Sequence, residues 1–110
     1  MTETKILQIL TAWQTSMQLC EERMDQLAAV AGPVVESPLG DAVYGLMGAY
    51  TRQVADQIGW DWGTLESWWC ENHFGERPLN IGFVGQEMRT VATVEELAAF
   101  IAEDLARGEP

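Results

Sequence analysis

Apolar residues recur along residues 3–31 in alternating steps of four and three positions. This spacing predicts a long helix that packs along another helix. The apolar positions are Ile6, Leu10, Trp13, Met17, Cys20, Met24, Leu27 and Ala31. Thr2 or Thr4 can cap the start, and Gly32-Pro33 ends the helix because proline cannot continue it. The partner helix belongs either to the same chain or to a second copy. In the second case, the dimer seam consists of Ile6, Leu10, Trp13, Met17 and Met24.

Two further helices are predicted before residue 76. The first runs from Ser37-Pro38 to Gly59, since serine is a good N-cap and proline suits the first helical position. Its expected buried stripe is Leu39, Val43, Leu46, Tyr50, Val54 and Ile58. The second covers residues 60–75, with Thr64 or Asp61 as its cap. Trp68 and Trp69 in that helix point about 100° apart, so both are buried only if the helix is wedged between two surfaces.

The rest of the chain predicts a small β-hairpin and a last helix. Residues 77–91 contain strand-forming side chains between glycines, which indicates a hairpin that turns around Gly85-Gln86-Glu87. A capping box, Thr93-Val94-Glu95-Glu96, then begins a helix that Gly108 ends. We expect this helix to bury Val94, Leu97, Ala98, Ile101 and Leu105, and to expose Glu103 and Asp104.

The elements together predict one mainly α-helical domain over residues 1–110. It is of the α+β kind, a bundle of about four helices with a small C-terminal β-hairpin. No apolar run approaches the length of about 20 residues that crosses a bilayer, and the N-terminus does not read as a signal peptide. We therefore expect a cytoplasmic protein.

Charge narrows the choice of partners. The formal net charge is −11, from seventeen acidic and six basic residues, which disfavours DNA, RNA and anionic membranes as ligands. A protein with a basic surface is the favoured partner, and one class of such surface is built to hold nucleic acid. The alternative is that the acidic residues only keep the chain soluble.

An acidic and tryptophan-rich segment is the candidate binding surface. Its carboxylates recur every five residues, and two of its tryptophans can act as anchors. The candidate partner-binding residues are Asp56, Trp60, Asp61, Trp62, Glu66, Glu71 and Glu76. Because a step of five residues turns a helix by about 140°, only the fold decides whether these acids converge.

Candidates for catalysis or metal binding are few. Cys70 and His73 share a helix face, as a Cys–His nucleophile pair with Asn72 or Asp61 as orienting group would require. A zinc site would need Cys20 and a carboxylate in addition. Both cysteines lie in predicted apolar stripes, so buried and reduced thiols are expected. We therefore expect no enzymatic activity, no cofactor and no metal.

The C-terminal half resembles a group of small acidic proteins encoded by phages and prophages. The resemblance covers about residues 60–105 and rests on the segments Trp69–Arg77, Gly82–Gly85, Arg89–Leu97 and Phe100-Ile101. The shared pattern is an aromatic helix ending in acid-Asn-x-x-Gly, a hairpin that contains glycine, then Arg-x-Val/Ile-x-Thr-Val and a last helix. The resemblance implies a bacterial cell that carries a phage, where such proteins include inhibitors of the anti-CRISPR type.

The charge, the apolar seam and the resemblance together suggest two possible functions. The favoured one is a non-enzymatic, phage-type inhibitor that uses its acidic surface against a nucleic-acid-binding protein of a host defence complex, such as a CRISPR surveillance complex. The alternative is a phage or prophage scaffold or regulatory module that acts through the apolar helix seam. For both functions we expect a homodimer, with the helix over residues 3–31 as its seam. Salt separates them, because binding by the acidic surface weakens with ionic strength and binding by the seam does not.

Overall fold

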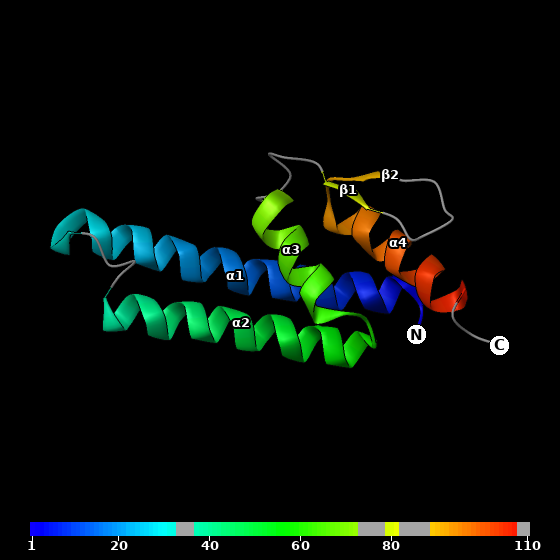
Figure 1. Ribbon diagram of the computed structural model, residues 1–110, viewed down its shortest axis with the longest axis horizontal. Helices are drawn as coiled ribbons and strands as arrows, with labels where there is room; N and C mark the ends of the chain where they lie inside the picture. Colours follow the sequence, from blue (N-terminus) through cyan, green and yellow to red (C-terminus); the bar gives the residue numbers. More distant parts are fainter. Residues whose placement is uncertain (33–36, 73–78, 82–88, 108–110) are drawn as a thin grey trace.

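The molecule is elongated, with two long helices and two shorter helices that pack on them. The computed structural model describes residues 1–32, 37–72, 79–81 and 89–107. Its elements are α1 (Glu3–Ala31), α2 (Pro38–Ile58), α3 (Trp62–Asn72), β1 (Leu79–Ile81), β2 (Arg89–Val91) and α4 (Val94–Arg107). α1 and α2 lie side by side along the long axis, α3 packs on α2, and α4 packs on α1 (Figure 1). The mainly α-helical fold class is confirmed.

The C-terminal half of α1 and the N-terminal half of α2 extend beyond α3 and α4 (Figure 1). The described residues span 52 × 24 × 21 Å, so the molecule is about twice as long as it is wide. We call this extension the two-helix arm. Its helices have fewer neighbours to cover them than the part that α3 and α4 enclose.

The helix ends follow local rules that the sequence already indicated. The Thr2 hydroxyl accepts a hydrogen bond from the Lys5 N–H at 3.2 Å and caps α1. The Ser37 hydroxyl accepts from the Gly40 N–H at 3.1 Å, directly before the proline that begins α2. Gly59 ends α2 in the left-handed conformation, with φ of 83°, which a residue with a Cβ rarely adopts.

The capping box of α4 forms as the sequence predicted. The Glu96 N–H donates to the Thr93 hydroxyl at 3.1 Å, and the Glu96 carboxylate accepts from the Ala92 N–H at 3.3 Å. The buried residues of α4 are Val94, Leu97, Ala98, Phe100 and Ile101, with Leu105 partly buried. Glu103 is exposed, as expected. The predicted stop at Gly108 lies outside the described residues.

The two strands pair in antiparallel fashion. Leu79 lies opposite Val91 in the register, and the pairing continues to Ile81 opposite Arg89. Val91 is buried, and its carbonyl accepts a hydrogen bond from the Trp68 indole N–H at 3.2 Å. This bond ties β2 to α3. The predicted turn at Gly85-Gln86-Glu87 lies outside the described residues.

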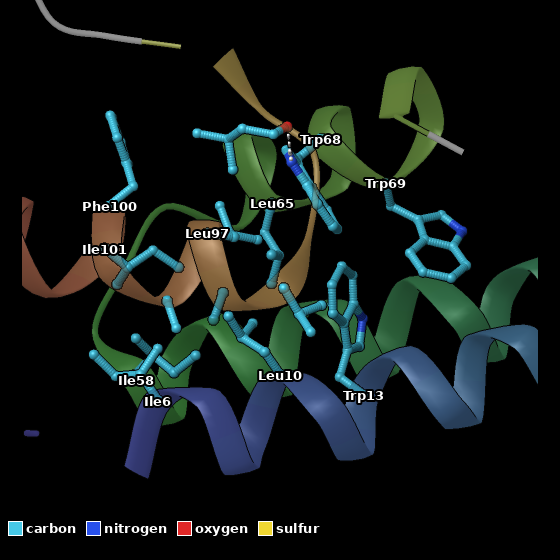
Figure 2. Packing of buried hydrophobic residues seen from close by; sticks show 14 of the residues in the cluster. Ile6, Leu10, Trp13, Ile58, Leu65, Trp68, Trp69, Leu97, Phe100 and Ile101 are labelled. Carbon is cyan, nitrogen blue, oxygen red and sulfur yellow. Dashed lines mark hydrogen bonds between the residues drawn. The ribbon is translucent and has the colours of Figure 1, made fainter. Parts of the chain in front are cut away.

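Three tryptophans form the centre of the core (Figure 2). The ring of Trp13 on α1 lies 5.2 Å from that of Trp69, edge to face, and 6.1 Å from that of Trp68, both measured between centroids. Trp68 and Trp69 are both buried, so α3 is wedged between two surfaces. One surface is β2, to which Trp68 is bonded. The other is the α1–α2 pair, where Trp69 lies beside Met17 and Met47.

The core uses the seam of α1 within a single chain. The residues predicted for a dimer seam, Ile6, Leu10, Trp13, Met17 and Met24, are all buried in this chain alone. The first four belong to one cluster with residues of α2, α3 and α4. These side chains are therefore not available to a second copy. The structure uses the seam for the intrachain core, which was the other possibility left open by the sequence.

The buried face of α2 differs from the predicted one. Its buried residues are Gly40, Met47, Thr51, Ala55 and Ile58, of which only Ile58 was in the predicted stripe. Val43 and Val54 are half-buried, whereas Leu39, Leu46 and Tyr50 are exposed. The buried side of α2 therefore combines the small Gly40, Thr51 and Ala55 with the larger Met47 and Ile58, while other large apolar residues of the helix face outward.

The buried hydroxyl of Thr51 gives a test of this packing. It accepts a hydrogen bond from the Trp13 indole N–H at 3.0 Å and donates to the Met47 carbonyl at 2.9 Å. Thr51→Val removes the acceptor and leaves the indole N–H buried without a partner. We expect a loss of about 1–3 kcal/mol in the free energy of unfolding, measured by denaturant titration.

The matched control is Thr15→Val on the exposed part of α1. The Thr15 hydroxyl donates to the Thr11 carbonyl at 3.0 Å, where water can replace it. We expect this variant to stay within about 0.5 kcal/mol of the parent. Equal unfolding midpoints for the two valine variants would contradict the role given to the buried bond.

Candidate functional site

The N-terminal end of α3 is fixed by Asp61 and not left open for a partner. The Asp61 carboxylate accepts from the Thr64 N–H at 2.8 Å and from the Thr64 hydroxyl at 2.7 Å. Both bonds lower the pKa of Asp61 below its ordinary value of 3.8, and the bond from the Thr64 hydroxyl has the larger effect. Asp61 is therefore the N-cap of α3, and its candidate role in partner binding competes with this structural one.

The two candidate tryptophan anchors have different surroundings. Trp60 is half-buried; its indole N–H donates to the Asp104 carboxylate at 2.8 Å, and its ring packs edge to face on Phe100, 6.2 Å away. It joins the α2–α3 turn to α4, so the expectation that Asp104 simply faces water is wrong. Trp62 is 40% exposed, and the Arg52 guanidinium lies 4.4 Å from its ring centroid. Of the two, Trp62 is the accessible anchor.

A groove of about 350 Å³ lies where α1, α2 and α3 meet. Its apolar lining comes from Met17, Met47 and Trp69. Carboxylates from two helices, Glu21 on α1 and Glu66 on α3, lie at the same groove together with Tyr44, Gly48, Thr51 and Cys70. We call this the acidic groove. Its composition, apolar side chains with a few polar groups at the border, is typical of a binding surface.

The pKa of the Cys70 thiol reflects the negative charges around the acidic groove. Partial burial raises the pKa of Cys70 above its ordinary value of 9.0, and the negative charges of Glu66, Glu21 and Glu71 raise it further. The three carboxylates therefore act on the same point in space. At neutral pH the thiol keeps its proton, which is the opposite of what a nucleophilic cysteine needs.

The structure brings together only part of the candidate acidic surface. Glu66 and Glu71 are exposed near Cys70, whereas Asp61 lies nine residues earlier, about 13 Å along the helix axis. Asp56 is exposed near the C-terminal end of α2. Glu76 lies outside the described residues.

Sequence reasoning missed Glu21, which comes from α1 and lies far from the acidic segment in sequence. The sequence pattern that could have identified Glu21 is its position in the helix, four residues after Met17 and three before Met24. A carboxylate on this side of an otherwise apolar seam indicates that the helix face opens to solvent there.

The chemical candidates from the sequence do not assemble a site among the described residues. Cys20 is half-buried, Cys70 is exposed rather than buried, and both are free thiols. Within residues 1–32, 37–72, 79–81 and 89–107, no group of three or more potential ligands could hold a metal ion. His73 lies outside these residues. In the described part of the chain, no helix has the length and apolar character to cross a membrane.

Comparisons of the chain with family models, with curated proteins and with solved structures find no match. The fold and the acidic groove are therefore the observations from which a function can be inferred.

The Asp61 cap predicts a pH-dependent contribution to stability. Since the pKa of Asp61 is lower in the folded state, its contribution is present above about pH 4 and lost as the pH falls through the folded value. Asp61→Ala should therefore lower the melting temperature at neutral pH, and the difference from the parent should narrow below pH 3.8. Thermal unfolding followed by circular dichroism measures both. Asp56→Ala, which removes an exposed carboxylate of α2, controls for the loss of one charge. The role of the cap is refuted if the melting temperatures of Asp61→Ala and the parent differ by the same amount at every pH.

The electrostatics of the acidic groove can be tested through Cys70. In a Cys20→Ser background, the rate of alkylation by iodoacetamide follows the thiolate form of Cys70. Glu66→Gln removes one of the charges that raise the pKa of Cys70, so the pH midpoint of alkylation should shift downward. Glu22→Gln, an exposed residue of α1 that does not act on Cys70, should leave the midpoint unchanged. The arrangement is wrong if both variants give the parent's midpoint.

Proposed function

We propose that this chain is a non-enzymatic protein-binding module that uses the acidic groove to bind a basic protein surface. The observation that carries the proposal is the groove itself, in which carboxylates from α1 and α3 border an apolar lining. Such a site suits a lysine or arginine side chain, whose aliphatic stem contacts apolar groups while its charged end reaches a carboxylate.

The charge of the whole chain supports this choice of partner. A net charge of −11 attracts basic proteins from a distance and repels nucleic acids. Long-range attraction of this kind raises the rate of association, and contacts at the groove then supply specificity. The exposed ring of Trp62, beside Arg52, is a second contact available on the surface of α2 and α3.

The biological setting that we propose is a bacterial cell that contains a phage or prophage. The resemblance over residues 60–105 suggests this setting, and a nucleic-acid-binding component of a host defence complex has the basic surface that the groove requires. The proposed effect is inhibition: the carboxylates occupy lysines or arginines that the complex otherwise uses for DNA. A CRISPR surveillance complex is the concrete partner to test.

Charge reversal at the groove tests this function. Glu66→Lys places a positive charge at the groove, whereas Glu22→Lys makes the same change in net charge on the exposed surface of α1. We expect Glu66→Lys to weaken binding to a purified surveillance complex by about tenfold or more, and Glu22→Lys to change it by about twofold or less. Binding is measured by interferometry at low and high salt, with circular dichroism to confirm that both variants are folded.

Salt dependence is the second readout. Binding of the parent should weaken as ionic strength rises, because screening shortens the reach of the carboxylates. Two results count against the proposal: no binding of the complex even at low salt, or equal binding by the Glu66→Lys and Glu22→Lys proteins. The first removes the proposed partner, and the second removes the groove.

A further inference from the structure

The α1–α2 pair has a second exposed surface that differs in charge from the acidic groove. A groove of about 360 Å³ lies between the two helices, and its lining includes Lys5, Gln8, Ala12, Tyr50, Gln53 and Gln57. None of these residues is acidic. In a chain with seventeen acidic residues, a groove bordered by glutamines, apolar side chains and one cation, Lys5, differs in charge from the acidic groove.

The outward side of α2 continues this surface along the two-helix arm. At 100° per residue, an uncharged set of residues lies within about 60° of Leu46 around the helix axis. They are Leu39, Ala42, Val43, Leu46, Ala49, Tyr50, Gln53 and Gln57. The charged residues of α2, Asp41, Arg52 and Asp56, lie about 80° or more away. Leu39, Leu46 and Tyr50 are exposed.

The matching side of α1 is also free of acids. Ala12 lies in the groove, and Leu19, seven residues later on the same side, is exposed. The acids of α1 are Glu3, Glu21, Glu22 and Asp25, which lie about 80° or more from Ala12 around the helix. We call the surface made by Gln8, Ala12, Leu19, Leu39, Leu46 and Tyr50 the acid-free face.

Charge decides which partner the acid-free face suits. A basic protein gains nothing from it, because the face offers no carboxylate. A second copy of this chain carries many like charges, and these oppose association wherever acids meet. At physiological ionic strength the Debye length is about 8 Å, so acids on the far sides of two copies are largely screened while acids at the contact would not be. The acid-free face is where two copies can meet without such contacts.

The size of the face also fits a pair of copies. α2 has 21 residues, which gives a length of about 30 Å, and two adjacent helices are about 20 Å wide. The footprint is therefore roughly 600 Å², and interlocking side chains bury more accessible surface than a flat footprint. A standard interface buries about 800 Å² on each partner.

We propose that the acid-free face is the interface of a homodimer, in which the α1–α2 pairs of two copies pack face to face around a two-fold axis. Such an interface must match itself, and this face brings no carboxylates together, since its charged side chains are the cations Lys5 and Arg23 of α1. The dimer would join four helices in the manner of a bundle. This proposal does not rest on the proposed function, because the acidic groove lies on the other side of α2.

Two positions on α2 give a matched test. Leu46 is 46% exposed on the acid-free face, and Tyr44 is 49% exposed at the acidic groove, about 160° around the helix. We expect the full chain to sediment as a concentration-dependent dimer. Leu46→Glu should raise the dimer dissociation constant by about tenfold or more, and Tyr44→Glu should change it by about twofold or less. Circular dichroism checks that both variants are folded.

Leu39→Glu is a second variant on the acid-free face. It lies in the first turn of α2, where the helix dipole favours a carboxylate, so the fold tolerates it. It should weaken the dimer as Leu46→Glu does. The proposal is overturned if the parent is a monomer at every concentration, if neither Leu39→Glu nor Leu46→Glu weakens the dimer, or if Tyr44→Glu weakens it equally.

Discussion

The indole of Trp13 is the contact on which the arrangement of the helices depends. Its N–H bonds to Thr51 on α2, and its ring packs on Trp68 and Trp69 of α3. A buried indole needs a partner for its N–H, and it finds one at a single position along α2, so this bond sets how α1 and α2 lie against each other. The same ring holds α3 in place. The acidic groove follows from this arrangement, because Trp69 lines it and Glu66 projects from the same helix.

The ends of the helices were predictable, since they depend on residues close together in the chain. Thr2, Ser37, Gly59 and the capping box at Thr93 act within a few residues of the ends that they define. The buried face of α2 was not predictable in the same way, because two stripes of similar periodicity compete. One contains Leu39, Leu46 and Tyr50, and the other contains Gly40, Met47, Thr51 and Ala55. Packing against α1 and α3 selects the second stripe, through contacts such as the bond from Trp13 to Thr51, and these contacts depend on partner surfaces that the sequence of α2 does not contain.

The acidic groove shows the same contrast between what nearby residues predict and what only the fold brings together. Glu66 and Glu71 belong to the predicted acidic segment and lie near Cys70, because one short helix carries all three. Glu21 and the apolar lining come from other helices, and only the fold brings them there. Trp60 and Asp104 show the converse: both read as surface residues, yet they bond to each other across 44 positions in the chain. Contacts of this range leave no local pattern, which is why a half-buried tryptophan resembled an anchor.

The uneven distribution of charge bears on whether the acidic residues serve solubility alone. A surface suited to solubility is charged and free of exposed apolar patches, and such patches often mark interaction sites. On this chain, the exposed Leu39, Leu46 and Tyr50 share one side of α2 with alanine and glutamine, whereas Glu21 and Glu66 lie at the acidic groove, where Met17, Met47 and Trp69 are already buried. The separation of an acidic groove from an acid-free face agrees with the two contacts that we propose, one with a basic partner and one with a second copy of the chain.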